Sequence, residues 1–182
     1  MTTANPSIKA NKATALTTPV LCMTALFMGI NIMLSSFGLP VPGGRLYLND
    51  IIICTAAILL DNYWCAFAVG GIGAFLGDLF FYPTPMFVSL VTHGFQALVI
   101  SYCANRMFGK PCFKGAVIGV LLGAVIMVVG YSLGRAFIYS TPHYAYIKLP
   151  YQILQAAVGA FFGVMLTYKA GLKETYERII KK

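Results

Sequence analysis

The chain has 182 residues, of which 59% are hydrophobic and only 10% charged, against about 25% charged in an ordinary soluble domain. This composition excludes a soluble globular enzyme and indicates an integral membrane protein with a single transmembrane domain, residues 1–182. The formal net charge of +8 does not indicate nucleic-acid binding, because the 13 Lys and Arg residues are spread thinly rather than gathered with aromatic side chains into one patch.

Six apolar runs, bounded by charged residues or helix breakers, follow a polar N-terminal segment at 1–16. They cover residues 17–37, 46–60, 62–81, 84–105, 113–139 and 149–169, and a basic tail follows at 170–182. A spanning helix needs about 20 apolar residues, so the second run is short, because only the ten residues 51–60 lie between Asp50 and Asp61. GLPVPGG at 38–44 and YPTP at 82–85 end the helices before them. The sequence predicts an all-α bundle of six transmembrane helices and no cleavable signal peptide.

The distribution of positive charge predicts how the bundle lies in the membrane. An even number of spans places both termini on one side, and that side holds ten of the 13 Lys and Arg residues. These ten are Lys9, Lys12, Arg106, Lys110, Lys114, Lys169, Lys173, Arg178, Lys181 and Lys182, whereas Arg45, Arg135 and Lys148 fall on the other side. Because positively charged loops are retained in the cytoplasm, we predict that both termini are cytoplasmic.

Polar side chains within membrane spans are costly unless they are paired or face water, so each one is a candidate functional residue. With this orientation they converge on the outer ends of four helices and on one outer loop. The candidate ligand-binding residues are Arg45, Tyr47, Asn49, Asp78, Ser89, His93, Gln96, Tyr131, Arg135, Tyr139, Tyr151, Gln152 and Gln155. Ser89, His93 and Gln96 share one helix face, because they are spaced i, i+4 and i+7. The pattern predicts an outward-facing pocket with aromatic walls for a small, flat, polar ligand.

Some of these residues also have a purely structural interpretation. Asp78 and Arg135 could form an ion pair, and His93 could make a packing contact through its ring N–H. Tyr139, with the tyrosines at 144, 146 and 151, could belong to the belt of aromatic side chains that is common at membrane surfaces. The convergence of so many polar groups on one end of the bundle favours the pocket.

The sequence offers no catalytic or metal-binding motif. No span carries two carboxylates at helical spacing, neither histidine has Cys or Glu residues at metal-ligand spacing, and the five cysteines form no C-x-x-C pair. A GxxxxGK[ST] phosphate loop is also missing, so any ATP hydrolysis is expected in partner subunits. We therefore predict no enzyme activity, no metal and no cofactor.

Small residues recur at every fourth position in several spans, a spacing that allows helices to approach closely in lipid. They are Ala25 and Gly29; Gly73 and Gly77; Gly115, Gly119 and Gly123; Gly130 and Gly134; and Gly159 and Gly163. Most are interpreted as packing positions within the bundle. Ala25 and Gly29 lie on a first span with few other features, and they predict a smooth face that docks a partner.

Several short motifs occur together between Asn49 and Phe108 and in the last span. They are Leu76-Gly77-Asp78 at the end of a Gly-rich third span, the Pro83-Thr84-Pro85 turn, the His93-Gly94-Phe95-Gln96 core of the fourth span, and PYQILQ from Pro150 to Gln155. In these motifs, in its length and in its six spans with cytoplasmic termini, the chain resembles the substrate-binding membrane subunits (S components) of energy-coupling factor (ECF) vitamin transporters.

The resemblance implies a high-affinity binding protein that captures a vitamin outside the cell and delivers it by toppling in a bacterial cell membrane. It would do so while docked on a transmembrane coupling subunit, the T component, and two ATPase subunits. Ala25 and Gly29 would then contact the coupling subunit. The loop between the first two spans would gate the pocket.

The resemblance also implies the ligand class. The chain is most similar to the branch for hydroxymethylpyrimidine, pyridoxine or riboflavin-like ligands, and a pyridoxine or hydroxymethylpyrimidine type is favoured. Its ring would stack on tyrosines and be bonded by side chains among Asp78, His93, Gln96 and Gln155. Arg135 and Lys148 would suit an anionic ligand.

A self-sufficient homo-oligomeric transporter or channel is the alternative function. Such a carrier needs a polar route through both halves of the bilayer, whereas the inner halves of the first, fourth, fifth and sixth spans are almost wholly apolar. A membrane scaffold without a ligand would leave the outer polar cluster unexplained. The sequence therefore favours the S-component interpretation.

Overall fold

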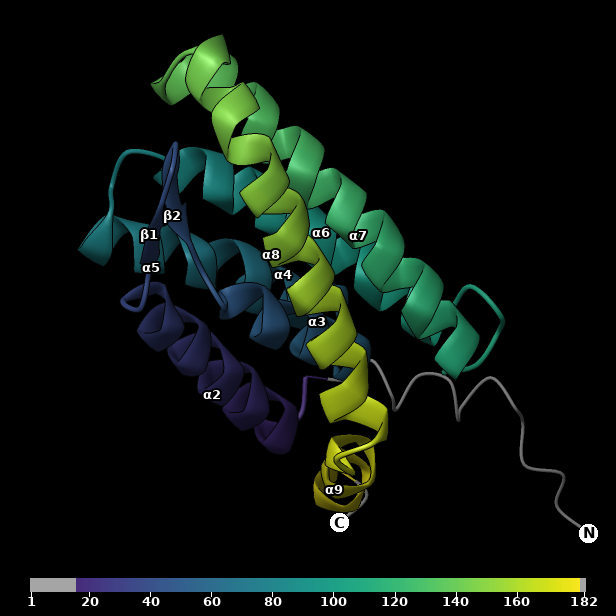
Figure 1. Ribbon diagram of the computed structural model, residues 1–182. Helices are drawn as coiled ribbons and strands as arrows, with labels where there is room; N and C mark the ends of the chain where they lie inside the picture. The colour runs from purple at the N-terminus through teal and green to yellow at the C-terminus, as the bar shows by residue number, and fades with distance from the viewer. Residues whose placement is uncertain (1–15, 181–182) are drawn as a thin grey trace, which may run out of the picture.

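The computed structural model of the protein describes residues 16–180, and its helices form a bundle (Figure 1). The elements are α2 (Thr18–Ser35), β1 (Leu39–Val41), β2 (Gly44–Leu46), α3 (Asn49–Leu59), α4 (Tyr63–Phe67), the π-helical turn η1 (Ala68–Ile72), α5 (Gly73–Phe81), α6 (Met86–Asn105), α7 (Phe113–Gly134), the π-helical turn η2 (Arg135–Tyr139), α8 (Pro142–Tyr168) and α9 (Leu172–Ile180). The β1–β2 hairpin and the start of α8 lie at one end of the bundle, and α9 lies at the other (Figure 1). Lys9, Lys12, Lys181, Lys182 and all but the last residue of the polar segment 1–16 lie outside the described residues.

Within residues 16–180, five helical segments are long and apolar enough to cross a membrane. They are Thr18–Ser35, Tyr63–Phe81, Met86–Asn105, Phe113–Tyr139 and Pro142–Tyr168, and they correspond to five of the predicted spans. The sixth prediction, 46–60, forms only the 11-residue helix α3, which extends about 16 Å at 1.5 Å per residue in a hydrocarbon core about 30 Å thick. The helical membrane bundle agrees with the prediction, but the second span is too short to cross by itself.

The outer surface of the bundle is covered by large apolar side chains. Trp64, Phe95, Phe137 and Phe161 are each more than half exposed, and many leucines and valines of α2, α7 and α8 are exposed beside them. Soluble monomers rarely expose apolar patches larger than a few hundred Å². This surface therefore fits a chain whose helices face lipid.

The loop after α2 contains a short antiparallel hairpin that the sequence did not predict. Leu39 pairs with Leu46 and Pro40 with Arg45. Between the strands, Gly43 has a φ of +79°, which is the value that the second central position of a type II turn requires. Three-residue strands are too short to show an alternating pattern, so only the helix-breaking character of this stretch is visible in the sequence.

Helix α8 begins at Pro142, seven residues before the predicted start of the last span. Proline is favoured in the first helical turn because its missing N–H has no helical partner there. Pro150, the second residue of the predicted span 149–169, lies inside the helix. The longer helix places Lys148 and Gln152 on one buried face, one turn apart.

Glycines at four-residue spacing mark where helices touch. A Cβ atom added to Gly115 of α7 would lie 2.3 Å from the carbonyl oxygen of Cys103 in α6, and one added to Gly159 of α8 would lie 2.5 Å from Cβ of Asp50 in α3. Gly73, Gly77, Gly119, Gly123, Gly130, Gly134 and Gly163 would likewise meet an atom of another helix at 3.0 Å or less. The packing interpretation of these residues is confirmed. Gly29 differs, because an added Cβ would have no atom within 4 Å.

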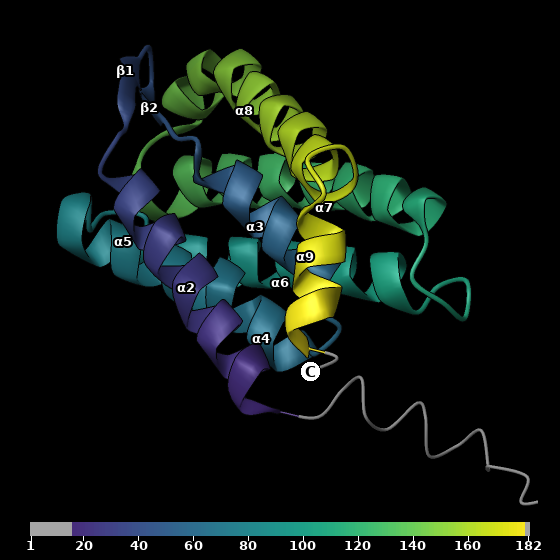
Figure 2. The ribbon, with the colours of Figure 1, turned by 90° about the horizontal axis from the view of Figure 1, so that it is seen from below.

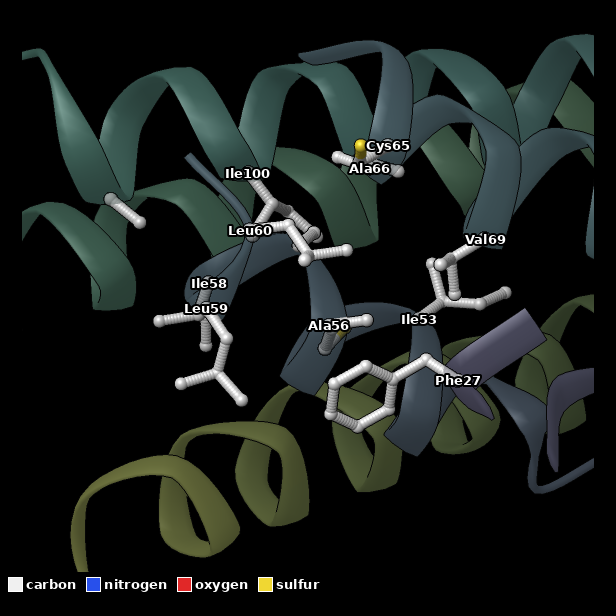
Figure 3. Packing of buried hydrophobic residues seen from close by; sticks show 14 of the residues in the cluster. Phe27, Ile53, Ala56, Ile58, Leu59, Leu60, Cys65, Ala66, Val69 and Ile100 are labelled. Atoms are coloured by element: carbon white, nitrogen blue, oxygen red, sulfur yellow. The ribbon is translucent and has the colours of Figure 1, made fainter. Parts of the chain in front are cut away.

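Helix α3 lies between α2, α6 and α8 (Figure 2), and nine of its 11 residues are buried. Ile53 and Ala56 of this helix pack with Leu60, Val69 and Ile100, all of them fully buried (Figure 3). At the far end of this core, the predicted basic tail forms α9, whose apolar residues at 172, 176 and 180 pack against the cluster. The apolar core thus fills the bundle from its middle to the end opposite the hairpin.

Candidate ligand-binding site

A small cavity lies beneath the β1–β2 hairpin, where polar residues of several elements meet. It is lined by Arg45, Tyr47, Asp78, Tyr82, Pro85, Met127, Tyr131, Arg135, Tyr139, Lys148, Gln152 and Gln155. The space open to the centres of water molecules is about 30 Å³, and one water needs about 10–15 Å³. In this conformation the cavity has room for a few waters, so a larger ligand requires part of the cavity lining to move.

Two cationic side chains fasten the hairpin over the cavity. Arg135 donates from Nη1 to the carbonyl oxygen of Gly43 at 2.5 Å. Lys148 donates from Nζ to the carbonyl oxygen of Arg45. Glycine at position 44 permits the approach of Arg135, because a Cβ added to Gly44 would lie 3.0 Å from Nη1. The hairpin is therefore held by hydrogen bonds from η2 and α8.

Tyr47 follows the hairpin and closes one side of the cavity. Its backbone N–H donates to Oε1 of Gln155 at 3.1 Å. Its hydroxyl is protonated at neutral pH, as tyrosine hydroxyls ordinarily are, and can donate a hydrogen bond.

Asp78 is the carboxylate of the cavity wall, and two neighbours orient it. Ser89 donates from Oγ to Oδ2 of Asp78, and the same Oγ lies 2.5 Å from the hydroxyl oxygen of Tyr131. Because the single hydroxyl hydrogen of Ser89 is directed at Asp78, Tyr131 is the donor to Ser89. Among residues 16–180, no nitrogen of Arg135 lies within 4.0 Å of a carboxylate oxygen. The ion pair considered for Asp78 and Arg135 is therefore not formed.

A second carboxylate, Asp50, lies behind the cavity in a buried network. Gln96 donates from Nε2 to Oδ1 of Asp50 at 3.1 Å, and Gln155 donates from Nε2 to Oδ2 at 2.6 Å. His93 Nδ1 lies 2.6 Å from Oε1 of Gln96 and 3.7 Å from Oδ1 of Asp50. Since Oε1 of Gln96 can only accept, this arrangement places a hydrogen on Nδ1 of His93. All four side chains are buried, so the network fixes their orientations.

The candidate set lacks Asp50, and it lacks four residues of the cavity lining, Tyr82, Pro85, Met127 and Lys148, of which only Lys148 was named from the sequence, as a cation that would suit an anionic ligand. In the sequence, Asp50 was interpreted only as the edge of an uncharged stretch. A carboxylate inside an otherwise uncharged run is itself a signal, because ionisable residues at membrane depth are rare and usually functional. Lys148 shares a helix face with Gln152 and Gln155. The predicted last span begins at residue 149, so Lys148 was not counted as part of that helix.

The candidate residues fall into three groups in the structure. Arg45, Tyr47, Asp78, Tyr131, Arg135, Tyr139, Gln152 and Gln155 line the cavity. Ser89, His93 and Gln96 contact these or Asp50 from α6. Two candidates within residues 16–180 do not line the cavity. Asn49 is buried at the start of α3, and Tyr151 is half-buried on α8. Of the tyrosines considered for an aromatic belt, those at 144 and 146 are exposed, whereas Tyr139 lines the cavity.

A π-helical turn at Arg135–Tyr139 keeps three residues of one helix on the cavity. Two steps of four residues along an α-helix rotate a side chain by about 80° around the axis. The wider π turn reduces that rotation, so Tyr131 and Tyr139 stay on the same side as Arg135. Such turns are frequent at functional sites.

Comparison with known proteins places the chain in a family. A family model described as "ECF-type riboflavin transporter, S component" matches residues 15–173. The chain belongs to this family. A relative from Pyrococcus woesei, described as "Uncharacterized protein in gap 3'region", is 30% identical over 132 residues, or 71% of this chain and 86% of the relative.

The family assignment confirms the resemblance to ECF S components, a transporter family rather than an enzyme family. Together with the apolar helices it identifies a multi-pass membrane protein. It does not single out the hydroxymethylpyrimidine or pyridoxine branch. In this S component the predicted docking face of α2 is open, since Ala25 and Gly29 are both exposed.

Proposed function

We propose that this S component is the high-affinity vitamin-binding subunit of an ATP-driven ECF importer. It captures a small aromatic heterocycle in an outward-facing pocket beneath the β1–β2 hairpin. The observation that carries this proposal is the convergence of polar side chains from β2, α5, α7, η2 and α8 on one cavity, in a bundle whose outer surface is apolar. A pocket with apolar walls and a few convergent polar groups is typical of small-molecule sites.

The walls of the cavity favour a single-ring ligand of the pyridoxine or hydroxymethylpyrimidine type, which needs less opening of the closed cavity than a larger ligand would. Tyr82, Tyr131 and Tyr139 offer aromatic faces for stacking, and Met127 adds a flexible apolar contact. Riboflavin, after which the family model is named, has three fused rings and would displace the hairpin further. Riboflavin is therefore the comparison ligand in the test below.

The hairpin is proposed as the gate of this pocket. Arg135 and Lys148 hold it through the carbonyl oxygens of Gly43 and Arg45, and these hydrogen bonds can be broken and remade without unfolding a helix. Opening would expose the cavity, and closure would exclude water from the bound ligand.

We further propose that the chain, as one transmembrane domain, crosses a bacterial cell membrane six times with both termini cytoplasmic. The short α3 and the hairpin before it would together make the second crossing. The described cations Arg106, Lys110, Lys114, Lys169 and Lys173 lie at or beyond the helix ends opposite the hairpin, which supports this orientation. The T component would dock on the face of Ala25 and Gly29, and two ATPase subunits would supply the energy.

Ligand binding by the purified protein tests the proposal. In nanodiscs, we expect pyridoxine or hydroxymethylpyrimidine to bind with a Kd below about 1 μM (about −8 kcal/mol) and riboflavin more weakly, as measured by isothermal titration calorimetry. Native mass spectrometry of the freshly purified protein should show the same class of heterocycle retained. Tighter binding of riboflavin would correct the ligand class, and no binding of any of the three with no retained heterocycle would reject the function.

Transport assays separate this function from the alternative of a self-sufficient homo-oligomeric transporter or channel. Proteoliposomes that contain only this chain should bind the ligand and accumulate none. Accumulation inside them without ATP or partner subunits would show that the chain transports by itself.

A further inference from the structure

The cavity carries more positive charge than its carboxylates balance. Arg45, Arg135 and Lys148 line it, and Arg135 is only 9% and Lys148 only 2% exposed. In the part of the chain that the structure describes, none of the three forms an ion pair with a carboxylate. Arg135 and Lys148 donate hydrogen bonds to backbone carbonyl oxygens of the hairpin, and the Arg135 guanidinium also lies 5.2 Å from the ring centre of Tyr139, but neither cation meets an anion. Burying a charge without a counter-charge is costly, so these two cations lack the partner that their burial calls for.

Three hydrogen-bonding atoms at the cavity also lack partners. Within residues 16–180, Nε of Arg135 and the hydroxyl oxygens of Tyr47 and Tyr139 are buried without a hydrogen bond. The Arg135 Nε–H can only donate. The Tyr47 hydroxyl is protonated at neutral pH, as tyrosine hydroxyls ordinarily are, so it can donate. The atoms at the cavity that lack a hydrogen-bond partner are therefore mainly donors.

The two carboxylates near the cavity already have donors of their own. Asp78 accepts from Ser89, and Asp50 accepts from Gln96 and Gln155. Neither carboxylate therefore depends on Arg135 or Lys148 for a hydrogen bond. The partner of those cations is expected to come from outside the chain.

We propose that the ligand is an anion, a heterocycle that carries a carboxylate or phosphate group between Arg135 and Lys148. Arg45 adds positive charge at the cavity wall, and Tyr47 and Tyr139 donate to the oxygens of the anionic group. A guanidinium group suits this role because its planar N–H donors match carboxylate and phosphate oxygens. This inference rests on the proposed function and specifies the ligand class of the same site.

Matched ligand pairs that differ only in the anionic group test the proposal. We would measure Kd for pyridoxine and pyridoxine 5′-phosphate, for riboflavin and flavin mononucleotide, and for 4-pyridoxate, in nanodiscs of phosphatidylcholine. In the wild type, at least one anion should bind ten times or more tighter than its neutral partner. Lys148→Met and Arg135→Gln should each reduce this ratio at least fivefold. Lys110→Met, which removes an exposed cation at the other end of the bundle, is the matched control and should leave the ratio unchanged.

The ratio separates an anion site from a simple latch on the hairpin. If Arg135 and Lys148 only fasten the hairpin, their substitution changes the Kd of neutral and anionic ligands equally. Equal binding of both members of every pair by the wild type would overturn the anion proposal while leaving the proposed function standing. Repeating the titrations in nanodiscs that contain phosphatidylglycerol tests whether the anion is instead a lipid headgroup. If the anionic lipid occupies the site, the preference for anionic over neutral ligands disappears. That result would assign the site to a lipid headgroup and overturn the proposal.

Inorganic phosphate provides a test that does not depend on the vitamin. Thermal unfolding can be followed with a thiol-reactive dye, since Cys54, Cys65 and Cys103 are buried. At constant ionic strength, phosphate should raise the unfolding midpoint of the wild type and not of Lys148→Met. This response without binding of any vitamin would support the anion site and reject the proposed function. No response to phosphate and no binding of any anion would overturn the anion proposal, and only the additional failure of every neutral vitamin to bind would overturn the proposed function.

Discussion

The two halves of the bundle satisfy their buried polar side chains in different ways. In the half beneath the hairpin, Gln96 and Gln155 bond Asp50 from two different helices. In the opposite half, Thr55 and Thr167 donate to carbonyl oxygens of their own helices, and Ser101 to the carbonyl oxygen of Leu60. A hydroxyl that bonds a backbone carbonyl is already satisfied and offers little to a ligand. Hydroxyl groups bonded within the helical framework thus mark packing, whereas the cavity has side chains that bond one another and longer side chains, Arg135, Lys148 and Gln152, that reach carbonyl oxygens of another element.

The largest expected effect is a loss of stability when Gly115, in the packed half, is substituted. A Cβ there would lie 2.3 Å from the carbonyl oxygen of Cys103, and backbone cannot move aside as a flexible side chain does. Gly115→Val should therefore lower the free energy of unfolding by about 3 kcal/mol, measured as a lower midpoint in the thiol-dye assay. An unchanged midpoint would show that α6 and α7 do not pack this closely.

In the polar half, Asp50→Asn should weaken ligand binding about thirtyfold, or about 2 kcal/mol. The new amide presents a donor to Gln96 or Gln155, both of which now donate to Asp50, so the wall of the cavity rearranges. Calorimetric titration of the ligand measures the loss. Asp61→Asn is the matched control, because Asp61 pairs with Arg106 at the other end of the bundle. Equal losses in both variants would contradict the role given to Asp50.

Substitution of single cavity groups should have smaller effects. Arg135→Ala and Gln96→Ala should each weaken binding about tenfold, or about 1.4 kcal/mol, without unfolding the protein. Arg106→Ala, which removes an exposed arginine from the opposite end, should bind normally. The site assignment fails if binding is unchanged in both cavity variants.

Most of the bundle could be predicted from the sequence, because spans in lipid need long apolar runs and charged residues delimit them. The second span and the hairpin could not. The short apolar run 46–60 does not reveal that α3 stops at 11 residues, or that the chain before it pairs as strands. The start of α8 was obscured because Pro142 and Pro150 are both compatible with a first helical turn, and only the packing of the longer helix decides between them.

The sequence could predict most of the residues of the candidate site, but not which of their side chains bond one another. Helical spacing correctly grouped Tyr131, Arg135 and Tyr139, although it could not foresee the π turn that keeps them together. Spacing along one helix says nothing about bonds between helices. The pairing of Asp50 with Gln155, 105 residues apart in the chain, therefore required the fold.

The smallest expected effect on stability concerns Gly29, which matches Gly115 in residue type and differs in surroundings. A Cβ on Gly29 would meet no atom within 4 Å, so Gly29→Val should change the unfolding midpoint little, within about 0.5 kcal/mol, and leave ligand Kd unchanged. If α2 docks the T component through a smooth face, the bulkier side chain should lower ATP-driven uptake in proteoliposomes that contain all subunits. Normal uptake by Gly29→Val would remove Gly29 from the docking face. A lower midpoint would instead show that Gly29 packs within the chain, and the contrast with Gly115 would be wrong.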